Sequence, residues 1–290
     1  MNLLLPTIGF GIVTASILAL AAVGFTLQFS VTGVVNFAFG DLMTLAAYTA
    51  WLVNTGLHWN VWIGAIVGMV GLAIVSVLMN RLLLQPFIRK RTDLFGLLIV
   101  TFAFGLIVQN VLQAIFGPNF QSYVYPPSSS VKALGMIFTV NQLIIVGLAV
   151  VAMLLVHVLL RYTKLGKAMR AMADDAALAR ACGIKVGRIT DLAWLISGAL
   201  AGLAGFVLVL NTATFSSATG QGFLLVIVAA TILGGVGRPY GAMLGALVVG
   251  LVTEVSATVL PPEDKSVSAF VILVVVLLLR PQGIIAAARG

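Results

Sequence analysis

The sequence predicts an all-α, polytopic membrane protein, and two observations support this prediction. Of its 290 residues, 61% are hydrophobic and only 8% are charged, whereas about a quarter of the residues in soluble domains are charged. Apolar runs recur along the chain at about 20 residues, the length that a helix needs to cross a hydrocarbon layer roughly 30 Å thick. We therefore expect one transmembrane helical bundle over residues 1–290.

The apolar runs give the predicted helices in order. Hydropathy is nearly continuous over 8–54 and over 222–260, so eight to ten spans are expected. The first run lacks a basic n-region and is too long for the h-region of a secretory signal, so we expect it to be retained as a helix. The runs lie at 8–29, 34–54, 61–83, 94–116, 141–160, 192–212, 222–235, 242–260 and 267–279.

The net charge of +8 is unevenly distributed along the chain. If helices alternate in direction from residue 94 onward, only Lys132 and Lys265 of the 16 Lys and Arg residues fall on the second face, which leaves fourteen on the first. Basic loops stay cytoplasmic. The charge is thus a topology signal, with contact to anionic lipid as a possible addition, and does not indicate nucleic-acid binding. The predicted cytoplasmic segments are 85–92, 162–190 and the C-terminus, and the predicted external ones are 118–138 and 261–266.

One short charged stretch, GKAMRAMADDAALARACGI at 166–184, interrupts the apolar chain. Arg170 and Asp174 are spaced i, i+4 on one helical face, and Gly183 follows as a C-terminal cap. A modestly apolar stripe on another face is formed by Leu165, Met169, Met172, Ala176 and Ala179. These features predict a helix over 167–182. Its many alanines favour a docking helix for a cytoplasmic partner, and a solvated linker helix on the membrane is the alternative.

Two apolar segments are broken by glycine and polar residues, TGVVNFAFGDLMTLAAY at 32–48 and ILGGVGRPYGAMLGALVVG at 232–250. Interrupted segments in the two halves of a chain indicate broken helices, a transport path and an internal repeat. Other glycines have the small-xxx-small spacing that lets membrane helices pack closely, and we assign them a structural role. These pairs are Gly64/Gly68, Gly198/Gly202, Gly237/Gly241 and Gly241/Gly245.

Ionisable residues inside spans are functional candidates, because each costs several kcal/mol unless it faces a cavity or a partner. Asp41 and Glu254 are the two that interrupt apolar runs. Each has a structural alternative: Asp41 as the N-cap of the helix that begins DLMTLAAY, and Glu254 as a residue that reaches the outer interface, seven positions before Pro261. The residues predicted to lie beside a translocation path are Asn36, Phe37, Phe39, Gly40, Asp41, Asn211 and Glu254.

The sequence lacks the common catalytic and metal-binding motifs. It contains no GxxxxGK[ST], HExxH, GxSxG or CxxC pattern. With Cys182 as the single cysteine and His58 and His157 as the only histidines, neither an intrachain disulfide nor a metal site is expected. We therefore expect no enzyme and no bound cofactor, so uphill transport would draw on an ion gradient or on a separate ATPase.

Four stretches of the chain, in their order, resemble the permease subunits of ABC importers for branched-chain amino acids. They are the two interrupted segments, the stretch GKAMRAMADDAALARACGIKVGRI and the terminal LLLRPQGI. The likeness covers nearly the whole chain, whose length is similar to that of the shorter of the family's two permeases. It implies a multi-pass protein of the bacterial inner membrane with a second permease as heterodimer partner, two cytoplasmic ATPases that use ATP, and an external solute-binding protein. The residues that it places in the cytoplasmic coupling segment are Gly166, Arg170, Ala171, Ala173, Asp174, Asp175, Gly183 and Ile184.

The sequence departs from the family pattern at one site. The family usually reads NFAHGE where this chain has Phe39 in place of the histidine and Asp41 in place of the glutamate. Neighbouring families import urea, short amides and polar amino acids on the same plan, so these substrates are alternatives. A proton-coupled secondary transporter that uses Asp41 or Glu254, and a passive channel for a small neutral solute, are further alternatives. The coupling-like stretch favours the ABC importer, because neither of these needs an ATPase-docking helix.

Overall fold

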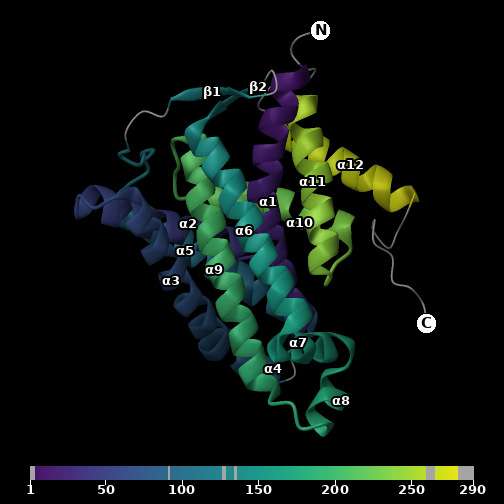
Figure 1. Cartoon of the computed structure of the whole chain (residues 1–290). Coiled ribbons are helices and arrows are strands. Elements are labelled where there is room, and N and C mark those ends of the chain that lie inside the picture. The colour runs from purple at the N-terminus through teal and green to yellow at the C-terminus, as the bar shows by residue number, and fades with distance from the viewer. Residues whose placement is uncertain (1–3, 91, 126–128, 134–135, 259–264, 280–290) are drawn as a thin grey trace.

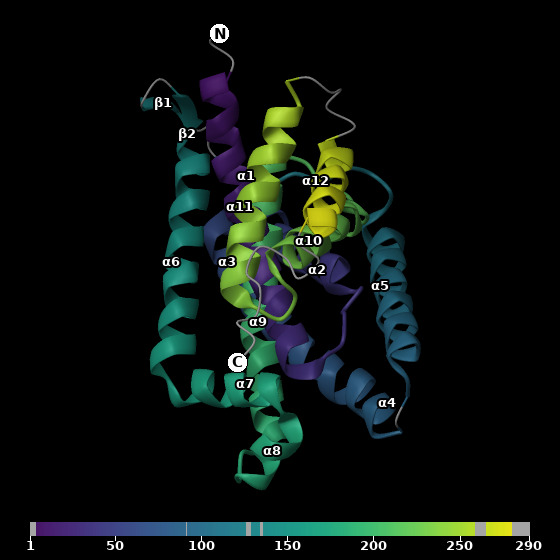
Figure 2. The ribbon, with the colours of Figure 1, turned by 90° about the vertical axis from the view of Figure 1, so that its right-hand side faces the viewer.

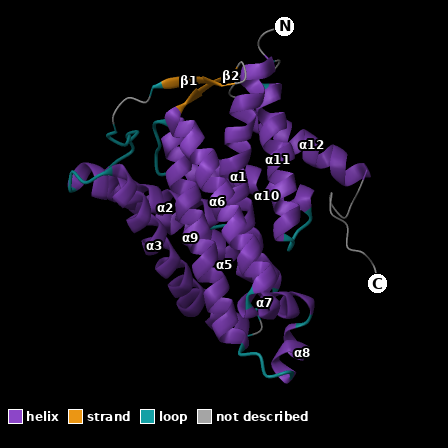
Figure 3. Ribbon diagram, viewed as in Figure 1, coloured by secondary structure: helices purple, strands orange, loops and turns teal. Residues whose placement is uncertain are grey.

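The computed structural model describes residues 4–90, 92–125, 129–133, 136–258 and 265–279, and most of them are helical (Figures 1 and 3). Two helices continue without a break into π-helical turns: α2 into η1, and α3 into η2, which is followed directly by α4. The first half contains α1 (Leu4–Thr32), α2 (Phe39–Trp51), η1 (Leu52–Gly56), α3 (Val61–Leu78), η2 (Met79–Leu84), α4 (Gln85–Arg89) and α5 (Leu94–Phe116). The second half contains β1 (Ser130–Ala133), β2 (Met136–Thr139), α6 (Val140–Tyr162), α7 (Lys164–Asp174), α8 (Ala176–Ala181), α9 (Val186–Thr212), α10 (Thr219–Gly234), α11 (Pro239–Ser256) and α12 (Lys265–Leu279).

Six helices of the described residues are long and apolar enough to cross a membrane. The runs predicted at 34–54 and 222–235 form shorter helices, because the first unwinds at its start and the second ends at a glycine turn. This is why the long candidates are fewer than the eight to ten spans predicted. The six are Pro6–Thr32, Val61–Arg89, Leu94–Phe116, Val140–Tyr162, Val186–Thr212 and Pro239–Ser256, and the shorter apolar helices include Thr219–Gly234 and Val267–Val276.

The two predicted faces of the protein correspond to opposite ends of the bundle (Figures 1 and 2). The antiparallel β1–β2 hairpin, which pairs Ser130 with Thr139 and contains Lys132, lies at one end beside the start of α1. The basic segments α4 and α7–α8 lie at the other end. The grouping of the charges thus agrees with the predicted topology, and the C-terminus from residue 280 onward lies outside the described residues.

Helix α2 lies in the interior, in contact with α3, α5, α9 and α10, and α1 packs against α6, α9 and α11. Close approach of backbones explains this arrangement. A Cβ atom on Gly64 would lie 2.6 Å from the Ala50 carbonyl oxygen of α2, and one on Gly202 would lie 2.8 Å from a Cα atom of α3. Gly64, Gly68, Gly198 and Gly202 therefore have the predicted packing role. Gly237 does not, because it lies in the α10–α11 turn with a φ of +82°.

Candidate translocation and coupling sites

The predicted interruption after α1 is present, and buried side chains hold it. Residues 33–38 are not helical. The Asn36 side chain, 1% exposed, donates to Gln28 Oε1 (2.9 Å) and accepts from the backbone N–H two residues further on (3.1 Å). Gln28 in turn donates to Ser76 Oγ of α3 (3.3 Å), and the backbone N–H that follows Asn36 donates to Thr101 Oγ1 of α5 (3.2 Å). Backbone that leaves the helix at membrane depth needs such partners, so Asn36 stabilises the broken segment.

Asp41 lies at the contact between α2 and α5. It is 3% exposed, and a Cβ atom on Gly105 would collide with its Oδ2 atom. Among the described residues its Oδ1 atom has no hydrogen-bond partner. The capping alternative is wrong: α2 begins at Phe39, its N-cap is Ala38 without a side-chain hydrogen bond, and Asp41 is already within the first turn. There it lies near the positive end of the helix dipole.

Helix α2 crosses α10 at two glycines. A Cβ atom on Gly40 would collide with the Gly220 carbonyl, and one on Gly220 with the Gly40 carbonyl. The Gly220 N–H donates to Thr44 Oγ1 (2.9 Å), which ties the start of α10 to α2. No other residue fits at either position without moving a helix. The sequence did not indicate Gly105, Thr44 or Gly220, because none of them belongs to a local pattern that points to its distant partner.

The other predicted path residues divide into two groups. Phe37 and Phe39 stay with Asp41: Phe37 is half-buried against Phe102 of α5 (6.5 Å between ring centroids), and Phe39 is fully buried. Asn211 is exposed near the end of α9, and Glu254 accepts a hydrogen bond from Thr14 of α1 (2.9 Å). The structure thus brings 36–41 together and leaves Asn211 and Glu254 elsewhere.

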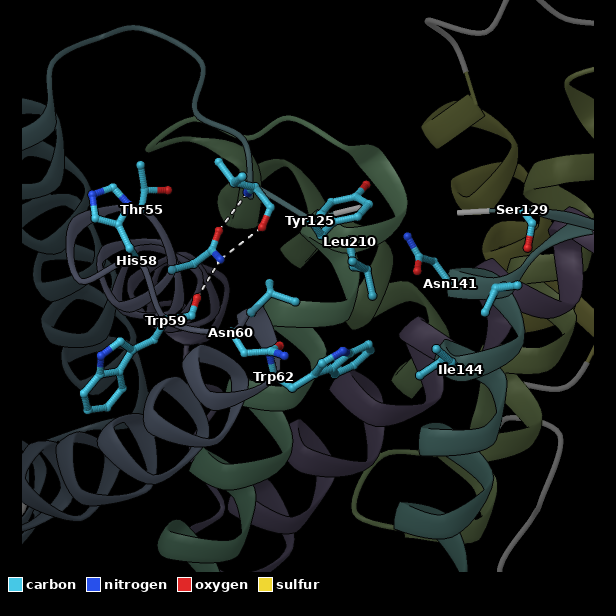
Figure 4. Close-up of a pocket in the computed structure, with 14 residues that line it drawn as sticks. Thr55, His58, Trp59, Asn60, Trp62, Tyr125, Ser129, Asn141, Ile144 and Leu210 are labelled. Carbon is cyan, nitrogen blue, oxygen red and sulfur yellow. Dashed lines mark hydrogen bonds between the residues drawn. The ribbon is translucent and has the colours of Figure 1, made fainter. Parts of the chain in front are cut away.

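A cavity of about 790 Å³ opens at the hairpin end of the bundle (Figure 4). Its wall combines the end of α2–η1, the start of α3, the loop before β1 and the start of α6. Because these segments are far apart in the sequence, no local pattern could indicate the cavity. Asn54 joins two of these segments: it donates to the Trp59 and Val124 carbonyls (3.0 and 3.1 Å) and accepts from the Val124 N–H (2.7 Å). Nearby, burial raises the pKa of Tyr123, so the phenol is neutral and donates to the Ala47 carbonyl (3.2 Å).

The predicted coupling segment forms two helices instead of one over 167–182. Helix α7 ends at Asp174, Asp175 adopts an extended conformation, and α8 begins at Ala176. The physical reason is capping: Asp175 Oδ1 accepts from the N–H groups of Ala177 and Leu178 (2.8 and 2.9 Å), and Asp is a favoured N-cap. The break changes the predicted stripe, because Ala176 is exposed. The predicted Gly183 terminus is present, with a φ of +84° just after α8.

Helix α7 packs closely against the bundle along one face. A Cβ atom on Gly166 would collide with the backbone at the end of α6, so the corner requires glycine. Met169 and Met172 are 2% and 4% exposed, as the predicted stripe required. Ala173 and the 62% exposed Leu178 of α8 remain accessible. The segment therefore has an anchored side and an open, small-residue side.

Arg170 and Asp174 share a face of α7, as their spacing predicted. Among the described residues no ion pair joins them to each other, whereas Arg81 and Asp191 pair at 2.7 Å. Arg170 and Asp174 line a cavity beneath the α10–α11 turn. Arg238, which lines the same cavity, is thereby placed at the end of the bundle that carries the other basic residues.

The fold and these sites define a polytopic helical membrane protein of the transporter class, with a broken interior segment and a helical excursion at one end. The family model described as "Branched-chain amino acid transport system / permease component" matches residues 7–279. The chain belongs to this family of permease components, as the resemblance indicated.

Individual relatives agree along nearly the whole chain. The high-affinity branched-chain amino acid transport system permease protein LivH of Salmonella typhimurium is 28% identical over 289 residues, covering 95% of this chain and 93% of the relative. The probable branched-chain amino acid transport permease protein LivH of Methanocaldococcus jannaschii is 30% identical over 297 residues, covering 94% and 90%. Among solved structures, PsaBC from Streptococcus pneumoniae in complex with Fab matches with a TM-score of 0.49 and 16% identity, covering 94% of this chain and 91% of that one.

These relatives are transport permeases, not enzymes, so this chain is a transport permease. Its six long apolar helices agree with the inner-membrane location predicted from the sequence.

Proposed function

We propose that this chain is a translocation subunit of an ATP-driven importer for branched-chain or other small amino acids. The proposal rests above all on the two-helix segment α7–α8, at the basic end of a permease whose relatives serve branched-chain amino acid transport. An excursion that is anchored through Met169 and Met172 and open at Ala173 and Leu178 fits a docking element. Two cytoplasmic ATPases, an external solute-binding protein and a second permease are the partners that this function requires.

We infer that nine helical segments lie in the bilayer. Six are the long candidates. The other three are α2–η1 (39–56), α10 and α12, whose apolar composition and interior or neighbouring positions support the same depth. This number lies within the eight to ten expected from hydropathy. With nine segments, α1 would run from the outer face to the cytoplasmic face, and α12 would end at the cytoplasmic face.

We further propose that residues 36–41 lie beside the path, near the second permease. The supporting observation is an unpartnered carboxylate oxygen, on Asp41, held at a helix contact. The charge-poor surroundings of residues 36–41 suit aliphatic amino acids. Urea and short amides are the alternative substrates, and a proton-coupled carrier is the alternative mechanism. The test is uptake of radiolabelled leucine into proteoliposomes that contain the whole complex, with and without ATP inside. A permease for urea or short amides would not take up leucine, and a gradient-driven carrier would not require ATP.

Docking of the ATPase on α7 is tested by Ala173→Trp. The added ring would overfill a close contact, at a cost of about 1–3 kcal/mol. We expect loss of ATPase co-purification or of substrate-stimulated hydrolysis, with the permease still inserted. The control is Leu155→Trp on the exposed surface of α6. Full ATPase binding and uptake in the Ala173 variant would show that α7 is only a linker.

A companion substitution separates charge from fold at Asp175. Asp175→Lys reverses the charge but also removes the α8 N-cap, which is worth about 1 kcal/mol. Asp175→Asn keeps a favoured cap and removes the charge alone. If the carboxylate sets the register of the docked ATPase, both variants lose coupling. If only the cap matters, Asp175→Asn retains it.

A further inference from the structure

Helices α1, α6 and α11 enclose an apolar groove of about 610 Å³. All three are long enough to span a membrane, and Figure 1 shows them side by side. On α6 the lining runs from Val146 to His157, a stretch of twelve residues that spans about 17 Å of helix. Half of a hydrocarbon layer is about 15 Å thick. The groove therefore has the depth of one leaflet.

The lower end of the groove is polar. The Tyr240 hydroxyl and His157 Nδ1 lie 3.1 Å apart. Tyr240 also lines a second cavity, of about 570 Å³, which lies between α7, the end of α1 and the α10–α11 turn. The two cavities are thus adjacent, the apolar one at leaflet depth and the polar one at the cytoplasmic end.

The second cavity presents opposite charges from one helix face. Arg170 and Asp174 of α7 both line it, one turn apart, and in the described part of the chain they do not pair with each other. Ser30 of α1 adds a hydroxyl, and Arg238 adds a second guanidinium. A guanidinium is suited to a phosphate, and a carboxylate to an ammonium group. A ligand that matches both would have a phosphate, a primary amine and a long apolar chain.

From this arrangement we infer a phospholipid site: a lipid of the cytoplasmic leaflet with an aminoethyl phosphate headgroup binds with its acyl chain in the α1–α6–α11 groove and its headgroup beside α7. The phosphate contacts Arg170 and the amine contacts Asp174. Basic pockets between membrane helices on the cytoplasmic side commonly hold lipid headgroups. The site joins the membrane to the helix proposed to bind the ATPase, but the inference does not depend on the transported substrate.

The test uses the full-length chain, purified in mild detergent with the subunits that accompany it. Native mass spectrometry with headgroup identification measures the retained lipid after exchange into equal amounts of phosphatidylethanolamine and phosphatidylglycerol. We expect one tightly held phosphatidylethanolamine per chain. Arg170→Gln should weaken its retention about tenfold, the loss expected for one hydrogen bond to a charged group. Asp174→Asn should abolish the preference for phosphatidylethanolamine while lipid stays bound.

Two groove substitutions address the acyl chain. Met153→Trp fills the groove and should displace the lipid, whereas Leu155→Trp, on the same helix but outside the groove, should not. Arg170→Gln lies outside the bilayer, so it tests the site even if Met153→Trp does not fold. The inference is overturned if retained lipid has the composition of the mixture, or if Leu155→Trp removes it equally. Cross-linking of Met153→Cys to a second permease chain would also overturn it, since a protein then covers the groove.

Discussion

Asp41 is an ionisable residue buried at a contact between two membrane helices. Its carboxylate is 3% exposed, faces the backbone of Gly105 and leaves one oxygen without a partner among the described residues. Buried polar groups are usually hydrogen-bonded, and leaving one unsatisfied costs about 1–3 kcal/mol. An unsatisfied buried group in a native structure needs an explanation, and a functional role is one. The α2–α5 contact is therefore where we expect the bundle to open.

Replacing Asp41 by Asn tests this expectation. The side chain keeps its shape and loses its charge, so the complex should assemble while leucine uptake falls about tenfold, which corresponds to about 1.4 kcal/mol. Uptake per assembled complex is the measurement. The matched control is Asp93→Asn, since Asp93 caps α5 through the Gly96 N–H and Asn caps equally well. Unchanged uptake in the Asp41 variant would contradict a role in the path.

At the scale of elements, glycine determines which helices can cross. Gly40 and Gly220 bring α2 and α10 into backbone contact. In lipid, such small-residue contacts stabilise helix pairs by van der Waals packing. The same physics places α3 against α2 and α9.

Gly220→Ala should therefore destabilise the protein by about 1–3 kcal/mol, because the added methyl group displaces a backbone carbonyl. Gly222→Ala, on the same helix with no atom within 4 Å of the added Cβ, should be neutral or slightly stabilising. Thermal unfolding of the two purified variants gives the comparison. Equal transition temperatures would mean that α10 can shift without cost.

The whole molecule is polarised by charge. The basic segments α4 and α7–α8 and the residue Arg238 lie at one end, and Lys132 lies at the other. Loops rich in Lys and Arg stay in the cytoplasm. From this asymmetry we predict that the hairpin and the 790 Å³ cavity face outward.

Cysteine labelling tests this orientation. The native Cys182 is exposed near the tip of α8, so it is first replaced by serine. In that background, Ser129→Cys should react with a membrane-impermeant maleimide from outside, and Lys185→Cys should react only after permeabilisation. Both positions are suited to the assay because both side chains are exposed. Labelling of both from outside would reverse the proposed topology.

Much of this protein could be predicted from the sequence, because the relevant free energies are local. Transfer of apolar side chains into hydrocarbon locates the long helices, and the Gly183 terminus depends on a few neighbouring residues. The broken segment at 33–38 and the packing role of Gly64 and Gly198 follow from composition and spacing in the same way.

Contacts between residues far apart in the sequence depend on how the helices pack in three dimensions. An apolar membrane helix has no polar face to distinguish its inner from its outer side, so shape complementarity selects its neighbours. Residue spacing therefore could not pair Asp41 with Gly105, or Gly40 with Gly220. The restart of the coupling segment at Asp175 was also decided in three dimensions, because packing of α7 on the bundle and capping of α8 together outweigh the helical propensity of the alanines.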